Sequence, residues 1–284
     1  MSRTVVITGA NSGIGLAAAR RFAQLGDRVV LAVRDTAKGE RAAESIDGES
    51  EVRKLDLTDL SSVRAFADGW NEPIDVLVNN AGVMAVPKGR TTDGFELQIG
   101  TNHLGHFALT NLLLGHITDR VVSVASGAHR IGRIDLADLN WETRKYDRWR
   151  AYGQSKLANL LFTLELQRRL DEAGSPVRAM AAHPGYASTN LQGNTGSPLQ
   201  HALMWLANRT VAQSDAAGAE PTVYAATEDL PGNSYVGPNG LQEMRGKPTL
   251  VNRSSAALDE EMARGLWELS EQLTGVGFVI QLTA

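Results

Sequence analysis

The sequence predicts an α/β protein with a three-layer α/β/α, doubly wound fold around a mostly or wholly parallel sheet. Three observations lead to this prediction. Short, nearly all-apolar runs rich in β-branched residues recur along the chain, amphipathic stretches of helical length separate them, and a glycine-rich segment follows the first run. Runs that are apolar on both faces indicate a sheet covered by helices on both sides. The right-handed crossover rule then favours a Rossmann-type order of strands.

Six runs are predicted to be strands, and the third has the weakest pattern. In chain order they are Thr4–Thr8, Val29–Val33, Val52–Leu55, Ile74–Asn79, Arg120–Ser126 and Val177–Ala182. The predicted helices are Ile14–Leu25, Ala37–Ile46, Ser61–Trp70, Phe95–His116, Tyr152–Leu170 and Ala256–Leu273. The apolar side of the last helix either completes the core or contacts another copy of the chain. That side carries Leu258, Met262, Leu266, Leu269 and Leu273.

Composition limits the function classes. The chain has 284 residues, of which 43% are hydrophobic and 21% charged, as in folded globular proteins. It shows no linker and no internal repeat, so we expect one domain over residues 1–284. A net charge of −4 with scattered arginines does not resemble a nucleic-acid-binding surface. The lack of cysteine excludes disulfides and thiolate nucleophiles.

The sequence offers no candidate for a membrane span. The apolar stretches around Leu109–Leu114 and Leu203–Ala207 fall well short of the ~20 residues that cross a bilayer. Met1–Arg3 leads directly into the first strand, without the layout of a signal peptide. We therefore expect a cytoplasmic protein.

Two irregular regions follow strands and are expected at the carboxyl edge of the sheet, where ligands of open α/β sheets bind. One lies at about 130–150 and includes the polar insert Asp135–Arg150, with Trp141, Tyr146 and Trp149. The other lies at about 190–215 and includes the apolar run Leu203–Leu206. We interpret both as elements of a substrate pocket, with surface decoration as the alternative. Leu203–Leu206 suits a lipophilic substrate and equally suits a helix packed on the core or on another subunit.

The glycine-rich segment after the first strand is typical of a nucleotide site. Its spacing is Gly-x-x-x-Gly-x-Gly, and its binding candidates are Gly9, Asn11, Ser12, Gly13, Ile14 and Gly15. Glycines allow a tight turn and close approach to a pyrophosphate, and the next helix directs its first N–H groups at that charge. Turn glycines without a ligand are the alternative interpretation.

The end of the second strand indicates which dinucleotide binds. A free ribose 2′-hydroxyl usually meets an acidic residue there, but Val33 cannot accept its hydrogen bond. Arg34 can instead bind a 2′-phosphate with its planar guanidinium group. NADP(H) is therefore favoured over NAD(H). The alternative for Arg34 is a solvated loop residue paired with Asp35, which is itself a good N-cap for the next helix.

Two further strand ends carry cofactor candidates. Asp56 and Leu57 follow the third strand, where the carboxylate can accept a hydrogen bond from an adenine amino group. The run Asn79, Asn80, Ala81 and Gly82 ends the fourth strand and can hold the strand edge together while the main chain approaches the cofactor. Ordinary turn chemistry explains each of these segments equally well.

A possible catalytic group comes from Ser126, Tyr152 and Lys156. Tyr152 and Lys156 are four residues apart on a predicted helix and share a face, and Ser126 ends the fifth strand. A phenol with an ordinary pKa of about 10 needs help to exchange protons at neutral pH. A nearby ammonium and a cationic nicotinamide lower that pKa, so Tyr152 can act as general acid or base during hydride transfer. Ser126 then hydrogen-bonds the substrate oxygen, and Lys156 also binds ribose.

These motifs, in this order and over essentially the whole chain, resemble the short-chain dehydrogenase/reductases. The resemblance implies a seven-stranded Rossmann fold, nicotinamide-dependent oxidoreduction and a catalytic triad of Ser126, Tyr152 and Lys156. It also implies that Asn102 is a fourth catalytic residue supporting a water-mediated proton relay. Pro184, Gly185 and Thr189 match the family's segment that contacts the cofactor.

A narrower resemblance is to the retinol dehydrogenase and protochlorophyllide reductase branch. It rests on Ser126-Gly-Ala-His, on the 26-residue step to Tyr152, and on Ser155-Lys-Leu-Ala-Asn-Leu-Leu-Phe162. The insert Asp135–Arg150 accounts for the long step. This chain departs from the branch in having no cysteine and no anchor ahead of the first strand. We expect the interconversion of a lipophilic carbonyl and alcohol, at the level of EC 1.1.1.-.

Other readings remain open. A catalytically silent NADP-sensing regulator would use the same fold, although such relatives usually lose the active-site Tyr or Lys. A sugar-nucleotide epimerase would need a different glycine spacing. No metal is expected, because His103, His106, His129 and His183 lack carboxylates at a ligand spacing. The apolar side of the last predicted helix also allows a homo-oligomer.

Overall fold

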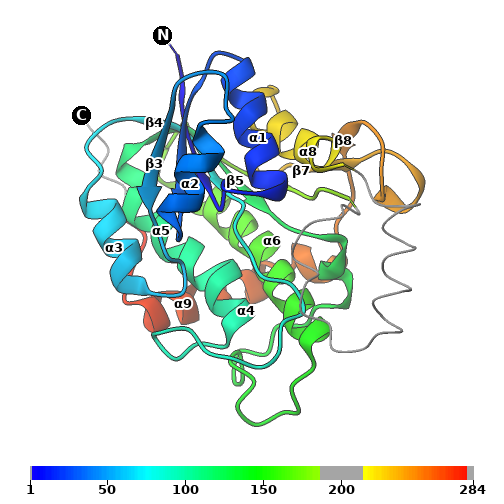
Figure 1. Cartoon of the computed structure of the whole chain (residues 1–284). Helices are drawn as coiled ribbons and strands as arrows, with labels where there is room; N and C mark the ends of the chain where they lie inside the picture. The colour runs from blue at the N-terminus through cyan, green and yellow to red at the C-terminus, as the bar shows by residue number, and fades with distance from the viewer. Residues whose placement is uncertain (1, 186–213, 280–284) are drawn as a thin grey trace, which may run out of the picture.

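The computed structural model of the chain describes residues 2–185 and 214–279. These residues form one eight-stranded sheet in the order β3-β2-β1-β4-β5-β6-β7-β8 (Figure 1). Its strands are β1 (Thr4–Thr8), β2 (Arg28–Val33), β3 (Ser50–Lys54), β4 (Ile74–Asn79), β5 (Ile117–Val124), β6 (Arg178–Ala182), β7 (Tyr235–Pro238) and β8 (Pro248–Leu250). Neighbouring strands from β3 to β7 pair in parallel, and β8 pairs antiparallel with β7.

The doubly wound, mostly parallel fold is confirmed, with one strand more than the seven expected. The extra strand is β8, a three-residue edge strand that follows β7 in a hairpin. Neither β7 nor β8 was predicted, because each is short and the pair contains Gly237, Pro238 and Pro248, which are rare in strands. β5 ends at Val124, so Ser126 lies just beyond the strand rather than inside it.

Helices cover both faces of the sheet. They are α1 (Gly13–Gln24), α2 (Thr36–Ala43), α3 (Leu60–Asp68), α4 (Leu97–Ile99), α5 (Gly105–Leu113), α6 (Arg148–Glu172), α8 (Asp215–Thr227) and α9 (Glu260–Thr274). Asp35 caps α2 as predicted, because its side chain accepts a hydrogen bond from the main-chain N–H of Lys38. The expectation of one α-helix over Phe95–His116 is wrong: a π-helical segment, Gly100–Leu104, separates α4 from α5, and a 3-10 turn follows Leu113.

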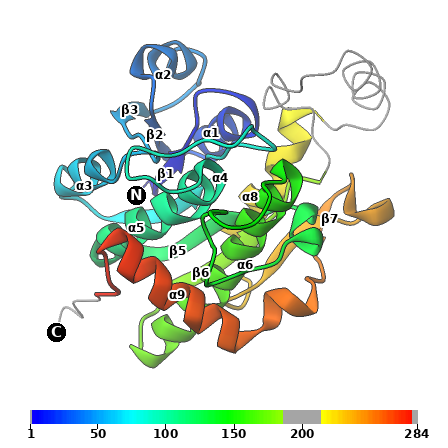
Figure 2. The ribbon, with the colours of Figure 1, turned by 90° about the horizontal axis from the view of Figure 1, so that it is seen from below.

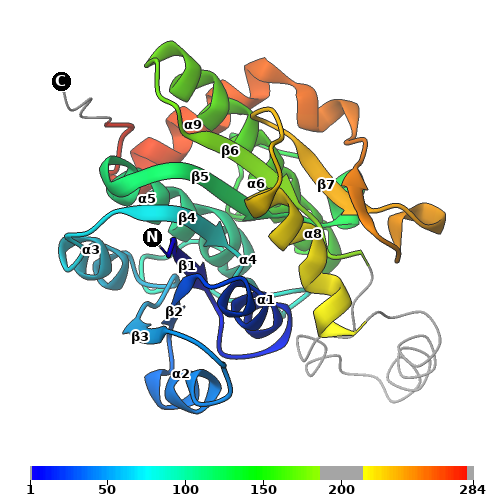
Figure 3. The same cartoon turned by 90° about the horizontal axis from the view of Figure 1, so that it is seen from above.

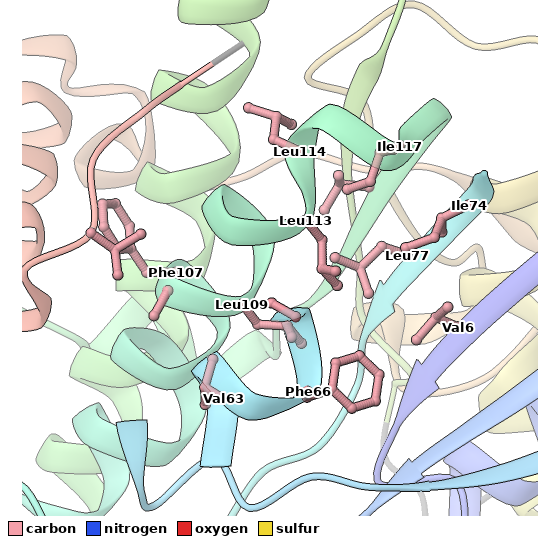
Figure 4. Close-up of a cluster of buried hydrophobic side chains, with 14 of the residues drawn as sticks. Val6, Val63, Phe66, Ile74, Leu77, Phe107, Leu109, Leu113, Leu114 and Ile117 are labelled. Atoms are coloured by element: carbon pink, nitrogen blue, oxygen red, sulfur yellow. The ribbon is translucent and has the colours of Figure 1, made fainter. Parts of the chain in front are cut away.

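Alternating strand residues build a core on each side of the sheet. In β1, Val5 and Ile7 belong to the cluster under α1, α2 and α8, whereas Val6 belongs to the cluster under α3, α5 and α6 (Figure 4). Seen from above, α1 and α8 lie side by side on the first face (Figure 3). Such alternation is what a buried parallel strand requires.

The last helix, α9, packs on α6 outside the second face (Figure 2). Leu266 is fully buried there, and Met262, Leu269 and Leu273 pack against the same cluster. The apolar side of α9 therefore completes the core, whereas Leu258 precedes the helix and is 54% exposed.

Some predicted features lie outside the described residues, namely Thr189, Leu203–Leu206 and most of the region 190–215. Among the helices the structure does describe, each is too short or too polar to cross a bilayer.

Candidate active site

A cavity of about 1140 Å³ opens at the carboxyl ends of β1, β4, β5 and β6. Its wall brings together most of the residues selected from the sequence. These are Gly9, Asn11, Ser12, Gly13, Ile14, Gly15, Arg34, Asp56, Leu57, Asn80, Ala81, Gly82, Ser126, Tyr152, Lys156, Pro184 and Gly185. Asn102 lies behind this wall instead of in it.

The glycine turn between β1 and α1 is packed directly against the end of β4. Gly9 has φ +68°, and a Cβ there would lie 2.9 Å from the Cβ of Ala81. A Cβ at Gly15 would lie 2.5 Å from Nδ2 of Asn80. Thr8 completes the junction, because its hydroxyl accepts the main-chain N–H groups of Asn80 and Ala81, each at 2.9 Å. Only glycines allow the main chain to approach this closely.

The start of α1 suits an anion. Ser12 is the N-cap residue, but its hydroxyl makes no capping hydrogen bond, and the first turn carries no acidic side chain. The positive end of the helix dipole and the uncapped N–H groups therefore face the cavity without a competing charge. A pyrophosphate fits this cradle.

Arg34 lies exposed just after β2, in the cavity wall with Asp35 and Lys38. The Asp35 carboxylate caps α2 and lies 3.4 Å from Nζ of Lys38, so the described ion pair is with Lys38 rather than with Arg34. The main-chain carbonyl of Arg34 accepts from Nζ of Lys54 at 2.6 Å. Two basic side chains, those of Arg34 and Lys38, therefore line this corner of the cavity. Lys38 was missed in the sequence although it lies only four residues after Arg34.

The other candidates at strand ends differ in their contacts and in whether they line the cavity. The carboxylate of Asp56 accepts from the N–H and hydroxyl of Thr58 at 3.0 and 2.7 Å, which is an ordinary Asx turn at the cavity wall. Asn80 donates to the carbonyl of Thr8 at 2.8 Å and holds the turn to β4. Asn79 is buried and donates to Thr110 in α5, so it supports the core side.

Ser126, Tyr152 and Lys156 meet at the middle of the cavity. Tyr152 and Lys156 share one face of α6, and the Nζ of Lys156 lies 5.8 Å from the phenol ring centroid. Ser126 caps a 3-10 turn (Gly127–Ile131), with its hydroxyl accepting from the N–H of Ala128 at 3.2 Å. The Ser126 hydroxyl lies near enough to the Tyr152 phenol to influence its pKa. The three groups are placed to act on one substrate oxygen.

Burial controls the ionisation of these groups. It raises the pKa of Tyr152 to about 12, and the nearby Ser126 hydroxyl opposes that rise. Burial also lowers the pKa of Lys156 to about 8, and its Nζ donates to the carbonyl of Val124 at 2.9 Å. In the protein alone, the phenol is therefore protonated at neutral pH, and the expected lowering of the Tyr152 pKa by Lys156 together with a bound nicotinamide stays a prediction.

Asn102 lies in the π-helical segment between α4 and α5. Its amide accepts from the N–H of Val83 at 2.8 Å and donates to the carbonyl of Val83 at 2.9 Å. The amide also donates to Ser155 in α6. The wide turn thus ties the Gly82-Val83 segment to the helix that carries Tyr152, and π-helical turns often occur at functional sites.

The expected substrate end is only partly built from the insert. Trp149 lines the cavity and its ring lies edge-on to that of Tyr152, with centroids 6.4 Å apart. Trp141 and Tyr146 instead pack on each other, and the Tyr146 hydroxyl contacts Gln98 and Glu96 just before Asn102. One aromatic of the three therefore faces the cavity, and the other two brace its wall.

Several lining residues were missed from the sequence. An apolar patch comes from Val83, Met84 and Leu97, and a polar rim comes from Arg130, His183, Gln242 and Glu243, with the apolar side chain of Met244 beside it. The last three lie in the hairpin loop between β7 and β8. The Asn239-Gly240 dipeptide signals a turn at this point, but the loop is not the two-residue turn that this signal usually marks, because its non-glycine residues with positive φ are Gln242 and Glu243.

The histidines have partners of their own. Within residues 2–185 and 214–279, no three His, Asp or Glu side chains are grouped so as to hold a metal ion. His103 contacts Ser270 at 2.9 Å, and Nε2 of His183 lies 3.1 Å from the Glu243 carboxylate. Burial lowers the pKa of both rings, to about 3 and about 4 respectively.

Comparison with known proteins agrees with this geometry. A family profile described as short chain dehydrogenase matches residues 3–200. Human retinol dehydrogenase 13 is 43% identical over 96% of this chain and 85% of that protein, and mouse retinol dehydrogenase 14 is 41% identical over 96% and 86%.

Solved structures are also similar. A crystal structure described as an uncharacterized protein from Mycobacterium paratuberculosis is 58% identical, with a TM-score of 0.86 over 98% of this chain and 95% of that one. A structure described as an NAD(P)-dependent gluconate 5-dehydrogenase from Beutenbergia cavernae, with bound NADP, is 25% identical, with a TM-score of 0.60 over 78% and 88%.

Proposed function

Because the chain belongs to the short-chain dehydrogenase family of oxidoreductases, we propose that it interconverts a carbonyl and an alcohol with NADP(H). One observation carries this proposal. Ser126, Tyr152 and Lys156 open into the same cavity as the glycine cradle, so a proton donor and a dinucleotide site share one space. When bound, the nicotinamide supplies the hydride donor or acceptor.

Tyr152 is the proposed general acid for reduction. Its raised pKa keeps the phenol protonated at neutral pH, ready to give its proton to the carbonyl oxygen. Ser126 hydrogen-bonds the same oxygen and polarises the carbonyl. Lys156 is proposed to bind ribose hydroxyls and, as an ammonium, to stabilise the phenolate left after transfer. Asn102 is the proposed fourth member, because it holds the Gly82-Val83 edge against α6.

The proposed preference for NADP(H) rests on charge at the end of β2. Arg34 and Lys38 line the cavity there, and the nearby carboxylate of Asp35 already caps α2. A 2′-phosphate gains charge-assisted hydrogen bonds in this corner, where the basic side chains of Arg34 and Lys38 stand against the single carboxylate of Asp35. The bound NADP of the gluconate 5-dehydrogenase structure supports a nicotinamide dinucleotide in this fold.

The proposed substrate is lipophilic. Val83, Met84, Leu97 and Trp149 form an apolar side of the cavity near Tyr152. The similarity to retinol dehydrogenases 13 and 14 points to the same class, and long-chain or isoprenoid aldehydes are the first substrates to test.

The deciding experiment is Tyr152→Phe with NADPH and a panel of lipophilic and small polar aldehydes and ketones. We expect turnover to fall by about 10³-fold while the Kd for NADPH stays within about twofold, because only proton transfer is removed. Tyr224→Phe on α8, remote from the cavity, is the matched control and should retain full turnover. Substantial activity in Tyr152→Phe would refute the assignment of the acid. A wild-type chain that binds NADPH without any turnover would favour the sensing regulator.

A further inference from the structure

Two buried histidines make the same contact with two residues of the proposed site. Nδ1 of His106 lies 3.1 Å from the main-chain carbonyl oxygen of Asn102, four residues earlier. Nδ1 of His129 lies 2.7 Å from the main-chain carbonyl oxygen of Ser126, three residues earlier. Both rings are almost completely buried, with 3% and 1% of their surface exposed.

The partners fix the tautomer of His129. A carbonyl oxygen only accepts, so Nδ1 must carry the proton. The other nitrogen, Nε2, lies 3.1 Å from the main-chain N–H of Ser254, which only donates, so Nε2 must be bare. Burial lowers the pKa of His129, consistent with a neutral ring.

The same reasoning applies to His106. Its Nδ1 donates to the carbonyl of Asn102, and its Nε2 lies 2.8 Å from the hydroxyl of Thr8. Burial, opposed by the hydrogen bond to Asn102 and assisted by the charge of Lys156, lowers the pKa of His106 to about 4. The neutral ring therefore accepts the Thr8 proton, since the alternative acceptor, the Val78 carbonyl, is 3.4 Å away.

Each ring connects a site residue to a second structural element. The Ser126 carbonyl also accepts the main-chain N–H of His129 at 3.0 Å. His129 therefore bonds the Ser126 carbonyl twice, through its main chain and through its ring, at the turn that presents the Ser126 hydroxyl. Ser254 follows β8, and Arg130 binds the carbonyl of Asn252 in the same segment. The serine turn is thus anchored to the chain that continues from the β7–β8 hairpin.

His106 makes the corresponding connection on the cofactor side. The Thr8 hydroxyl that it engages also receives the N–H groups of Asn80 and Ala81, which close the glycine turn. Through this ring, the main chain of Asn102 is fixed to the floor of the cofactor cradle.

We propose that His106 and His129, as neutral Nδ1–H tautomers, are positioning residues that hold Asn102 and Ser126 by their main-chain carbonyls. This inference rests on the proposed function, since it assigns a role within that site. It assigns no contact with substrate to either ring. Simple core packing, the competing explanation, requires no particular tautomer and no particular ring nitrogen.

The first test needs no turnover. Histidine labelled with ¹⁵N distinguishes Nδ1–H from Nε2–H rings by their nitrogen chemical shifts, and His106→Asn and His129→Asn assign the two signals. Both rings should be neutral Nδ1–H tautomers at neutral pH, with and without NADPH. An Nε2–H or a doubly protonated ring at either position overturns the proposal for that residue, whether or not the protein is an enzyme.

The second test uses paired substitutions at each position. An asparagine amide nitrogen occupies the place of Nδ1 and keeps the donor to the carbonyl, whereas a glutamine amide oxygen reaches the place of Nε2 and keeps only the acceptor. We expect His129→Asn to keep kcat within about threefold and His129→Gln to lose about 30-fold, the loss of one oriented hydrogen bond to the site. KM should change little in either.

We expect the same difference in kcat between His106→Asn and His106→Gln. In His106→Gln we also expect a weaker affinity for NADPH. Thermal stability provides the control, because core packing predicts that kcat follows Tm. Equal loss of kcat in the Asn and Gln variants, or loss in proportion to Tm, overturns the positioning role. If the wild-type protein itself has no turnover, and the variants have none either, the proposed function has failed rather than the positioning role.

Discussion

The two ends of the cavity are built in different ways. The glycine cradle of the cofactor end comes from short runs of consecutive residues that follow two neighbouring strands, β1 and β4, and its contacts are mostly between main-chain atoms and small side chains. The substrate end gathers single side chains from distant segments, such as Val83, Leu97, Trp149 and Glu243. The cofactor end is therefore fixed by local sequence, whereas the substrate end depends on how remote loops meet.

This difference predicts opposite sensitivities. The cofactor end should tolerate almost no change in main-chain spacing, while the substrate end should change its affinity gradually as single side chains are altered. Four measurements test this predicted difference between the cofactor end and the substrate end.

The largest effect is expected from Gly9→Ala. The new Cβ would lie 2.9 Å from the Cβ of Ala81, so the glycine turn and the end of β4 must separate. We expect the Kd for NADPH to rise by about 100-fold, as a close main-chain contact to phosphate is lost. Gly174→Ala is the matched control, because φ is +63° there and nothing lies within 4 Å. It should cost about 1 kcal/mol of stability and leave the NADPH affinity unchanged. Equal NADPH affinities in the two variants would show that the turn adapts.

The next effect is expected from Arg34→Gln. Removing the guanidinium should raise the Kd for NADPH by about 30-fold, which corresponds to the loss of one or two charge-assisted hydrogen bonds. The Kd for NADH should not change. Titration of both cofactors by thermal shift measures this. Arg41→Gln, which removes the same charge from an exposed position on α2, should have little effect. A wild type stabilised mainly by NADH would remove the role given to Arg34.

The next effect is on pH dependence, which is expected to differ between carbonyl reduction and alcohol oxidation at Tyr152. The raised pKa of Tyr152 favours the phenol, and Lys156 with a pKa of about 8 stays charged below pH 7, so carbonyl reduction should be constant as the pH falls from 7 to 6. Alcohol oxidation needs the phenolate, and below the pKa its fraction falls about tenfold per pH unit. Steady-state rates in both directions test this. Parallel profiles would mean that Tyr152 is not the group that titrates.

The smallest effect is expected at the substrate end. Trp149→Ala should raise KM for a lipophilic aldehyde by about fivefold, the contribution of one aromatic contact, without changing the NADPH affinity. Trp149→Phe keeps an aromatic wall and should retain most of the affinity. An unchanged KM for lipophilic substrates, or turnover of small polar carbonyls alone, would contradict the lipophilic proposal.

The sequence reveals the cofactor end because the signals there are short and local. Six strands, the Asp35 cap and the glycine turn are each encoded by a few adjacent residues, and the structure has them where they are expected. The π-helical turn at Asn102 could not be predicted, because the bonds that hold it come from Val83 and Ser155, far away in the sequence. The prediction that the insert lines the substrate pocket was only partly right for the same reason. The place of its aromatic residues depends on distant partners, since the Tyr146 hydroxyl accepts from Gln98 and donates to Glu96.

The hairpin of β7 and β8 also determines how the sheet ends. Pro248 of the edge strand β8 lies opposite Pro238 of β7 in the register, and it has no N–H group to offer to a further strand. At the other edge, β3 carries Glu51, Arg53 and Lys54, and Arg53 is held in an ion network with Glu72. Charged side chains and prolines at edges prevent strands of another molecule from adding to a sheet. Both margins of the described sheet are therefore poorly suited to pairing with a strand of another molecule.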